Sequence, residues 1–485
     1  MKAGDISHVI LRSATKKDQN DISFALYDRP SAYIYISIPL PMLELVNPRG
    51  QSRLIFTGAS GQCNYWHTQV SPADRLSSPE RIAEMDGGRK MAVPYKMKFG
   101  VFMAPFHRVG ENPTLALERD LELLQWLDVL GFDEAYIGEH HSAGWETIAS
   151  PEIFMATAAE RTRHIRLGTG VISLPYHHPY MVANRMVLLD HLTRGRVILG
   201  VGPGALNSDA YMFGIDASRQ REMMDESLGI ILRLMTETEP ITYKSDWFEL
   251  HDATLQLRPY QHPHIPVAVA SAESPSGVTL AGKHGAAVLS MAVPRGTVRQ
   301  TTLKDLWSIA EESAAEHGKT VRREDWGIVS GVHLAESRKE AYEDIRVGGA
   351  RLVTEYFAET LGNPAPDVPQ DQILDYMVDH NQWIVGTPYD CIAGIERLQE
   401  MSGGFGSFMI RVEDWAPREK VLHSYELLAR YVMPHFQGSL IGIQTSNRWV
   451  SEVKETLQAS RREAIQRATD TYDARREEEK VNQAD

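Results

Sequence analysis

The run Lys98-Phe99-Gly100-Val101-Phe102-Met103 reads as a buried strand, and the next such run, residues 134–138, leads directly into Glu139-His140-His141. Between the two runs, leucines recur every three or four residues from Leu117 to Leu130, which is typical of one face of an amphipathic helix. Gly131 suits the left-handed residue that ends such a helix. A strand, a helix and a second strand in this order predict a βαβ unit with parallel strands.

The same alternation continues along the chain, with helices expected at residues 151–161 and 181–192. Further strands are expected at residues 165–172, 196–202, 267–270, 287–290, 327–333 and 408–412. With the first two, these make eight strands, the number that closes a (β/α)8 TIM barrel. A doubly wound sheet would need a GxGxxG turn after its first strand, where this chain has Ala104-Pro105-Phe106-His107. The predicted fold is therefore of the α/β class, with a closed parallel barrel.

Several segments do not fit this alternation. Residues 204–266 and about 354–383 are too long for ordinary barrel connections, and we expect insertions at the carboxyl face there. Apolar residues of the first insertion suggest a lid over a hydrophobic substrate, although such residues are more often core: Met212, Phe213, Met223, Met224 and Trp247. We expect an amino-terminal extension or small capping domain over residues 1–96, the barrel over 97–436, and a solvated helical tail over 437–485.

Composition limits the classes of function. The chain has 485 residues, 43% of them hydrophobic and 24% charged, and its formal net charge is −14. This acidic balance argues against binding to nucleic acid or to an anionic membrane surface. The two cysteines, Cys63 and Cys391, form no CxxC motif, which fits a reducing cytoplasm and argues against a structural zinc site. No run approaches 18 apolar residues, so we expect neither a membrane span nor an export signal.

Two adjacent histidines, His140 and His141, follow the second predicted barrel strand. They lie at its carboxyl end, where such barrels carry their active sites. Imidazoles at this place are candidates for proton transfer or for metal binding. Neighbouring residues of a strand point to opposite sides, and no convergent third ligand is evident in the sequence. We therefore expect no metal.

A set of short motifs follows in a fixed order: Glu111-Asn112-Pro113-Thr114-Leu115-Ala116-Leu117, Gly131-Phe132-Asp133-Glu134, Gly138-Glu139-His140-His141, Arg166-Leu167-Gly168-Thr169-Gly170-Val171, Leu174-Pro175-Tyr176-His177-His178-Pro179 and Asp190-His191-Leu192-Thr193-Arg194-Gly195-Arg196. Each string is weak alone, but their order and spacing together are specific. The set resembles the bacterial luciferase-like flavin monooxygenases over residues 97 to about 436. Within that superfamily, Gly200-Val201-Gly202-Pro203-Gly204 and Ser274-Pro275-Ser276-Gly277 resemble the limonene 1,2-monooxygenase type.

The resemblance implies a barrel that binds reduced flavin, usually FMN with FAD as an alternative, at its carboxyl face. Oxygen adds to the flavin C4a position, and the resulting peroxide or hydroperoxide transfers one oxygen atom of O2 to a hydrophobic organic substrate such as a terpene, ketone or aldehyde. Because the chain has no dinucleotide fingerprint, a separate NAD(P)H:flavin reductase is expected to supply the reduced flavin. A homo-oligomer is also expected. The alternatives are a deazaflavin-dependent dehydrogenase of the same superfamily and a flavin-binding protein without turnover.

The resemblance also assigns the two histidines. The first histidine of the family's Glu-His-His turn lies beside the isoalloxazine ring, and here that residue is His140. A pKa near neutrality would let His140 exchange a proton with the peroxyflavin or with the departing hydroxide. His141 is expected to have a structural role instead. An intact His140 counts against the flavin-binding protein without turnover.

The expected flavin platform lies on the next two strands. The family often has a non-proline cis peptide under the flavin ring, and the matching bond joins Gly170 to Val171. Ser173 follows on the same edge and is expected to hydrogen-bond a flavin carbonyl. Gly202, at the end of the following strand, is expected to contact the cofactor.

The expected phosphate site combines a turn with a cation. Ala272-Glu273-Ser274 resembles the family's phosphate turn, in which the Ser274 hydroxyl and nearby amides bind the phosphate. Arg219 begins a helix where relatives place a phosphate-binding arginine. Pro203 and Gly277 depart from the luciferase pattern, which has an arginine and a hydroxyl residue at these places. Phosphate affinity is therefore expected to depend more on Arg219.

Overall fold

The computed structural model describes residues 21–29, 32–39, 95–104, 106–271, 275–293 and 302–484, without side chains for 21–39 and 481–484. The chain divides into two compact units, Met1–Gly87 and Gly88–Asp485. In the first unit, β1 (Asp21–Arg29) and β2 (Ala32–Pro39) form an antiparallel hairpin. The residues of the candidate site lie in the second unit.

Eight parallel strands of the second unit form a closed barrel. They are β3 (Lys98–Met103), β4 (Glu134–Ile137), β5 (Arg166–Thr169), β7 (Val197–Gly202), β10 (Val267–Ser271), β11 (Ala287–Met291), β12 (Trp326–Leu334) and β14 (Ser407–Arg411). Each pairs with its neighbour in this order, and β14 pairs with β3, which closes the ring. The predicted TIM barrel is confirmed.

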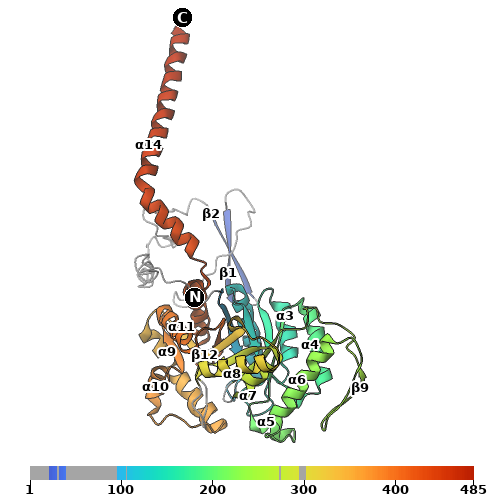
Figure 1. Ribbon diagram of the computed structural model, residues 1–485. Coiled ribbons are helices and arrows are strands. Elements are labelled where there is room, and N and C mark those ends of the chain that lie inside the picture. The colour runs from blue at the N-terminus through green and yellow to red at the C-terminus, as the bar shows by residue number, and fades with distance from the viewer. Residues whose placement is uncertain are drawn as a thin grey trace. The chain divides into compact units, whose positions relative to one another are not determined.

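Helices surround these strands (Figure 1). They are α2 (Pro113–Leu130), α3 (Pro151–Arg161), α4 (Pro179–Thr193), α6 (Gln220–Thr236), α7 (Pro275–His284), α8 (Leu303–Glu316), α9 (Arg338–Arg351), α11 (Pro388–Ser402) and α12 (Arg418–Leu427). Helix α2 is capped at both ends. The Asn112 side chain accepts hydrogen bonds from the first-turn amides, and Gly131, the residue expected to end the helix, has a φ of 84°. Pro113 supplies the fixed φ that suits a first turn.

Six of the eight strands each place one buried apolar side chain in the barrel interior. These side chains form a separate buried cluster: Tyr136, Ile198, Ala268, Leu289, Val329 and Met409. The other two strands contribute glycine, because a Cβ at Gly100 would lie 2.7 Å from the Met409 sulfur and a Cβ at Gly168 would lie 2.7 Å from the Tyr136 ring. The interior is therefore a packed core, and the chemistry has to take place at the strand ends.

Two short strands were not predicted. The expected continuous strand over residues 165–172 stops at Thr169 and resumes as β6 (Ile172–Ser173), which pairs with β7. Strand β13 (Trp383–Gly386) pairs with the carboxyl-terminal half of β12, although the sequence placed Trp383 at the end of an insertion.

The first expected insertion includes an ordinary barrel helix. Helix α6 connects β7 to β10, while α5 (Asn207–Met212) and the hairpin β8 (Ile241–Lys244) and β9 (Glu249–Ala253) are the added elements. Met223 and Met224 are buried on α6, which makes them core residues, in agreement with the more ordinary of the two interpretations. Met212 and Phe213 are exposed.

The second insertion precedes β13. It consists of a π-helix, η5 (Leu352–Thr360), a short 3-10 turn, η6 (Gln370–Gln372), and α10 (Ile373–Asp379). Together with loops that follow the first two barrel strands, these elements enclose a second apolar cluster that includes Phe106, Trp145 and Tyr356. The insertion therefore packs over the carboxyl end of the barrel.

The carboxyl-terminal part of the chain is helical. After η7 (Leu428–Val432) and α13 (Met433–Gln437), the chain forms α14 (Ile441–Ala484), a helix of 44 residues. The ring of Phe436 lies 6.0 Å from that of Phe99, and Gln437 Nε2 donates to the Met97 carbonyl. No helix in the described ranges is long and apolar enough to cross a membrane. The domain boundaries at residues 96 and 436 remain predictions.

Candidate active site

The candidate site starts where β4 ends. Gly138 follows the strand, and the chain then runs through Glu139, His140 and His141 into a loop that returns so that the His140 amide donates to the Ile148 carbonyl, 3.1 Å away. This loop brings Glu146 back beside His140. Two histidines and two carboxylates thus gather at the end of one strand.

His140 lies between two buried carboxylates. Its Nδ1 donates to Asp209 Oδ2 over 3.1 Å, and its Nε2 lies 3.3 Å from Glu146 Oε2. Burial opposes protonation of the ring, but the charges of Glu146, Asp209 and Glu139 outweigh it and raise the pKa of His140 above its ordinary value. The raised pKa shifts the ring toward the imidazolium form, which can donate a proton.

Asp209 connects the ends of two strands. It lies on α5, after β7, and its side chain also accepts hydrogen bonds from the His141 amide at 3.2 Å and from the Ser142 hydroxyl. Burial would raise the pKa of Asp209, but these bonds and the His140 charge lower it, so the carboxylate stays ionised. Asp209 therefore fixes both the charge and the orientation of His140.

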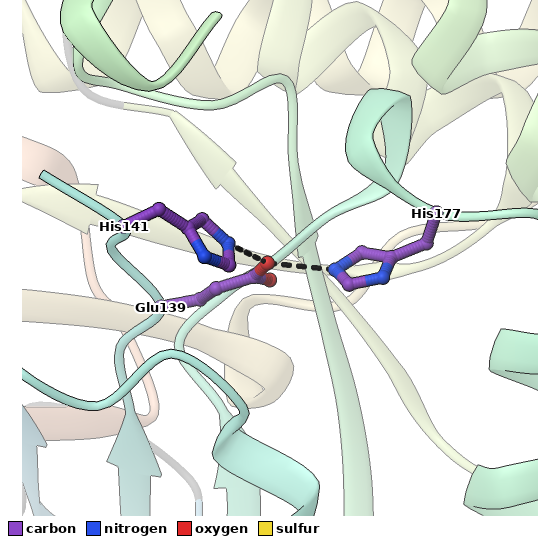
Figure 2. A group of neighbouring side chains, drawn as sticks. All are labelled: Glu139, His141 and His177. Atoms are coloured by element: carbon purple, nitrogen blue, oxygen red, sulfur yellow. Dashed lines mark hydrogen bonds and ion pairs between the residues drawn. The ribbon is translucent and has the colours of Figure 1, made fainter. Parts of the chain in front are cut away.

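A second carboxylate, Glu139, holds two other histidines. Figure 2 shows His141 and His177 pointing at its carboxylate from opposite sides. Their Nε2 atoms donate to Oε1 over 2.8 Å and 2.6 Å, and the Ser173 amide donates to Oε2 over 2.8 Å. Burial acts to raise the pKa of Glu139, but these bonds lower it. The bond to Glu139 also raises the pKa of His141. We call Glu139, His141 and His177 the Glu139 clamp.

The clamp shows that the expectation of no convergent third group beside the two histidines was wrong. A third group does converge, because His177 meets His141 at Glu139, and within the described ranges this is the one set of three side chains placed as metal ligands could be. A tetrahedral ion with bonds of 2.0–2.1 Å needs donor atoms about 3.3 Å apart. The contacts of 2.6 Å and 2.8 Å are shorter and have the lengths of direct hydrogen bonds. We interpret the group as a hydrogen-bonded clamp.

The residues expected to support the flavin lie at the ends of neighbouring strands. The Gly170–Val171 peptide is cis, which confirms the expectation. Gly170 leaves no room for a side chain, since a Cβ there would lie 2.7 Å from the Tyr136 Cβ, and a Cβ on Gly202 would lie 2.5 Å from Val171. Gly202 pairs with Ser173, whose amide is bound by Glu139. These residues adjoin the clamp at the carboxyl ends of neighbouring strands.

The expected phosphate residues have different outcomes. Ala272, Glu273 and Ser274 lie outside the described residues. Arg219 immediately precedes α6, and its guanidinium is exposed and paired with Asp246 at 2.5 Å. Arg221, two residues on, donates from Nε to the Ser276 hydroxyl over 3.2 Å, in the first turn of α7.

Arg221 was missed by the sequence analysis. Its spacing from Arg219 carried no signal, because only the packing of α6 against α7 brings the Arg221 side chain to Ser276. A guanidinium at the amino-terminal turn of a helix is a suitable anion site. The absence of side chains at Gly170 and Gly202 suits a flat flavin ring, and the Arg221 guanidinium suits an anionic phosphate.

The family assignment follows from this fold and site. The sequence profile of the luciferase-like monooxygenases matches residues 97–403. The chain belongs to the luciferase-like monooxygenase family, and it is an oxidoreductase of that class.

Two relatives and one solved structure give the assignment detail. The chain is 50% identical to 4-hydroxyprotoasukamycin monooxygenase of Streptomyces nodosus subsp. asukaensis, over 76% of this chain and 100% of that protein. It is 47% identical to limonene 1,2-monooxygenase of Rhodococcus erythropolis, over 71% and 88%. The oxygenating constituent of 3,6-diketocamphane monooxygenase from Pseudomonas putida, a type II Baeyer-Villiger monooxygenase solved with FMN, is similar at 25% identity with a TM-score of 0.60, over 70% and 98%.

Proposed function

We propose that this chain is the oxygenating component of a two-component monooxygenase, which receives reduced FMN from a separate NAD(P)H:flavin reductase. FAD is the alternative cofactor. When bound, reduced flavin would supply the two electrons that the reduction of O2 requires. One oxygen atom then enters the substrate and the other leaves as water. The single observation that best supports this function is His140, which lies between Asp209 and Glu146 after β4; the cis Gly170–Val171 peptide follows β5, the strand that pairs with β4.

In this proposal, different residues of the site donate the proton, support the flavin and hold the supporting residues in place. His140 donates a proton to the reacting oxygen from a ring that its two carboxylates keep charged. Gly170, Val171 and Gly202 support the flavin ring, and Ser173 bonds a flavin carbonyl. The clamp holds Ser173 at its amide, so that the platform and His141 keep one geometry.

The phosphate is placed between α6 and α7. The turn Ala272-Glu273-Ser274 provides a hydroxyl and backbone amides, and a guanidinium from the start of α6 provides the charge. Arg219 and Arg221 are the two candidates for that guanidinium. The contact from Arg221 to Ser276 favours Arg221, because Arg219 is already paired with Asp246.

A hydrophobic organic substrate is supported by aromatic side chains around His140 and Glu146. The ring of Tyr356 lies 4.8 Å from that of Phe106 and 5.4 Å from that of Trp145, and the Phe357 ring lies 5.0 Å from it. Rings of this kind bind apolar molecules through contact area and quadrupole interactions. Of the two relatives described above, one is named for limonene, a cyclic terpene, and the other for 4-hydroxyprotoasukamycin, so both names point to an organic substrate.

The proposal includes a homo-oligomer. It is supported by large apolar side chains that are exposed on α3 and α4: Ile153, Met181, Leu188 and Leu192. Exposed apolar residues on neighbouring helices suit a contact between copies of a chain. Light scattering coupled to size exclusion measures the mass directly, and a monomer at micromolar concentration would contradict this part.

Oxygen isotope incorporation tests the proposed reaction. The full chain is supplied with chemically reduced FMN, FAD or deazaflavin under 18O2, with a cyclic terpene and a cyclic ketone as probes. We expect products that carry one 18O atom with reduced FMN, and none with reduced deazaflavin. Reduction of the ketone to an alcohol by reduced deazaflavin, with no 18O in any product, would overturn the proposal in favour of hydride transfer.

A further inference from the structure

The π-helix of the second insertion reaches the neighbourhood of His140. Tyr356 lies on η5 and is 2% exposed, and its hydroxyl donates a hydrogen bond to Glu146 Oε1. Phe106 and Trp145, from the loops after β3 and β4, pack on the Tyr356 ring. The position of the hydroxyl is therefore fixed from two sides. π-helical turns are frequent at functional sites, and this one brings the Tyr356 hydroxyl to Glu146.

The other oxygen of Glu146 has an unusual environment. Oε2 is buried and accepts no hydrogen bond from the described residues, although it lies 3.3 Å from His140 Nε2. The contact is therefore an ion pair without hydrogen-bond geometry, and the Nε2 proton is not directed at Oε2. Glu146 supplies charge to the ring while its geometry leaves the Nε2–H free to point elsewhere.

The remaining charged groups around His140 act differently. Asp209 accepts from Nδ1, and its bond fixes the ring from behind. Glu139 contributes charge at longer range, while His141 donates to Glu139 and carries a like charge when protonated. Among these groups, Glu146 is the one that faces Nε2, the nitrogen that Asp209 leaves unbound.

We propose that Glu146 and Tyr356 are positioning residues for His140. The Tyr356 hydroxyl holds the Glu146 carboxylate beside the ring but out of line with the Nε2–H, so that this proton remains available to the reacting oxygen. The insertion before β13 is then part of the proton-donating apparatus, besides covering the barrel. The role in oxygen chemistry rests on the proposed function, but the effect on His140 does not.

Two substitutions separate the charge from its placement. Glu146→Gln removes the charge and keeps the shape, so the pKa of His140 should fall by about one unit or more. Tyr356→Phe keeps the charge but frees the carboxylate to rotate onto Nε2–H. In that variant the pKa of His140 should stay at or above the parent value, while the product formed per O2 consumed should fall by up to about 100-fold, as expected for a misplaced donor.

Histidine NMR of the isotope-labelled full chain measures the pKa without flavin or substrate, with His140→Asn to assign the signal. Tyr376→Phe is the matched control, since Tyr376 lies on α10 of the same insertion and its ring stacks on His380 at 3.9 Å. Circular dichroism establishes that each variant folds, and Glu146→Asp, which retains the charge, should restore part of the pKa if Glu146→Gln folds poorly.

The outcomes are distinct. An unchanged His140 pKa in Glu146→Gln, or equal product per O2 in Tyr356→Phe and Tyr376→Phe, would overturn the positioning role even in an active enzyme. If the chain fails to oxygenate any substrate, the proposed function fails, and the pKa measurements alone still decide whether Glu146 sets the charge of His140.

Discussion

His140 and His141 are neighbours in the sequence, yet their surroundings differ. His140 faces Asp209 on α5 and Glu146 in the loop after β4, and both its ring nitrogens lie beside carboxylates. His141 shares Glu139 with His177, and the other oxygen of Glu139 binds the Ser173 amide, a backbone group. Both arrangements raise the pKa of a histidine, but only the second also ties strand ends together through a backbone amide.

This difference shows how one strand end can serve two purposes. Because the chain leaves β4 with alternate side chains on opposite sides, consecutive imidazoles meet different partners. If the two surroundings differ in function as they do in geometry, substitutions of His140 and of His141 should have unequal effects on product formation.

The largest effect is expected at His140. His140→Ala should bind reduced FMN about as well as the parent but form product roughly 10²–10⁴-fold more slowly, because positioned proton transfer usually contributes that much. Hydrogen peroxide should appear in place of the product. His141→Ala is the matched comparison, and its product yield per O2 should stay much closer to that of the parent. Equal loss in both variants would remove the functional distinction between the two rings.

The clamp should matter mainly for stability. In Glu139→Gln the amide NH2 must face a donor, His141, His177 or the Ser173 amide, so we expect the free energy of unfolding to fall by about 1.5–3 kcal/mol. Since folding lowers the pKa of Glu139, its contribution is present above the unfolded value of about 4.3 and is lost as the pH falls through the folded value. Denaturant unfolding at pH 7 and pH 3 measures this. A difference between parent and variant that grows on acidification would contradict the account.

A third comparison concerns the two arginines near α7. Arg221→Ala should weaken reduced FMN by about 10- to 150-fold, the equivalent of a charge-assisted bond of about 1.5–3 kcal/mol. Arg219→Ala should weaken it only slightly, because Arg219 is exposed and paired with Asp246. Calorimetric titration with reduced FMN under anaerobic conditions measures both. The reverse order would return the phosphate to Arg219.

The smallest effect is expected from the segment before the barrel. Both histidine surroundings are built from residues after Met97, so a chain that starts at Met97 should keep the flavin affinity and the His140 pKa of the full chain. Titration of the two proteins side by side tests this. An insoluble shortened protein would show that the barrel depends on residues 1–96.

The barrel could be predicted because its signals are local and repeated. Leucine spacing and Gly131 indicated α2, and eight short apolar runs indicated the number of strands. Strand β13 was missed because its partner, β12, lies about fifty residues earlier and the pairing leaves no local pattern. Residues 272–274 lie outside the described ranges, so the phosphate turn remains a prediction.

The site was predicted in part. The family resemblance pointed to His140, whose role stays a prediction, and to the bond between Gly170 and Val171, for which the sequence alone favoured a plain barrel strand; that bond is cis. Asp209, Glu146 and Tyr356 were missed, because each comes from a separate segment and meets His140 or its partner only after the barrel closes. The one available signal was position, since Asp209 and Glu146 both follow barrel strands at their carboxyl ends.

Rapid mixing tests the central claim most directly. The full chain loaded with reduced FMN under anaerobic conditions is mixed with O2, and the flavin absorbance is followed for the parent and for His140→Ala. The account predicts a transient species in the parent, with a spectrum distinct from those of reduced and oxidised flavin, and a shorter lifetime with peroxide release in the variant. Oxidation of the parent's flavin in a single step, at the rate of free flavin, would contradict it.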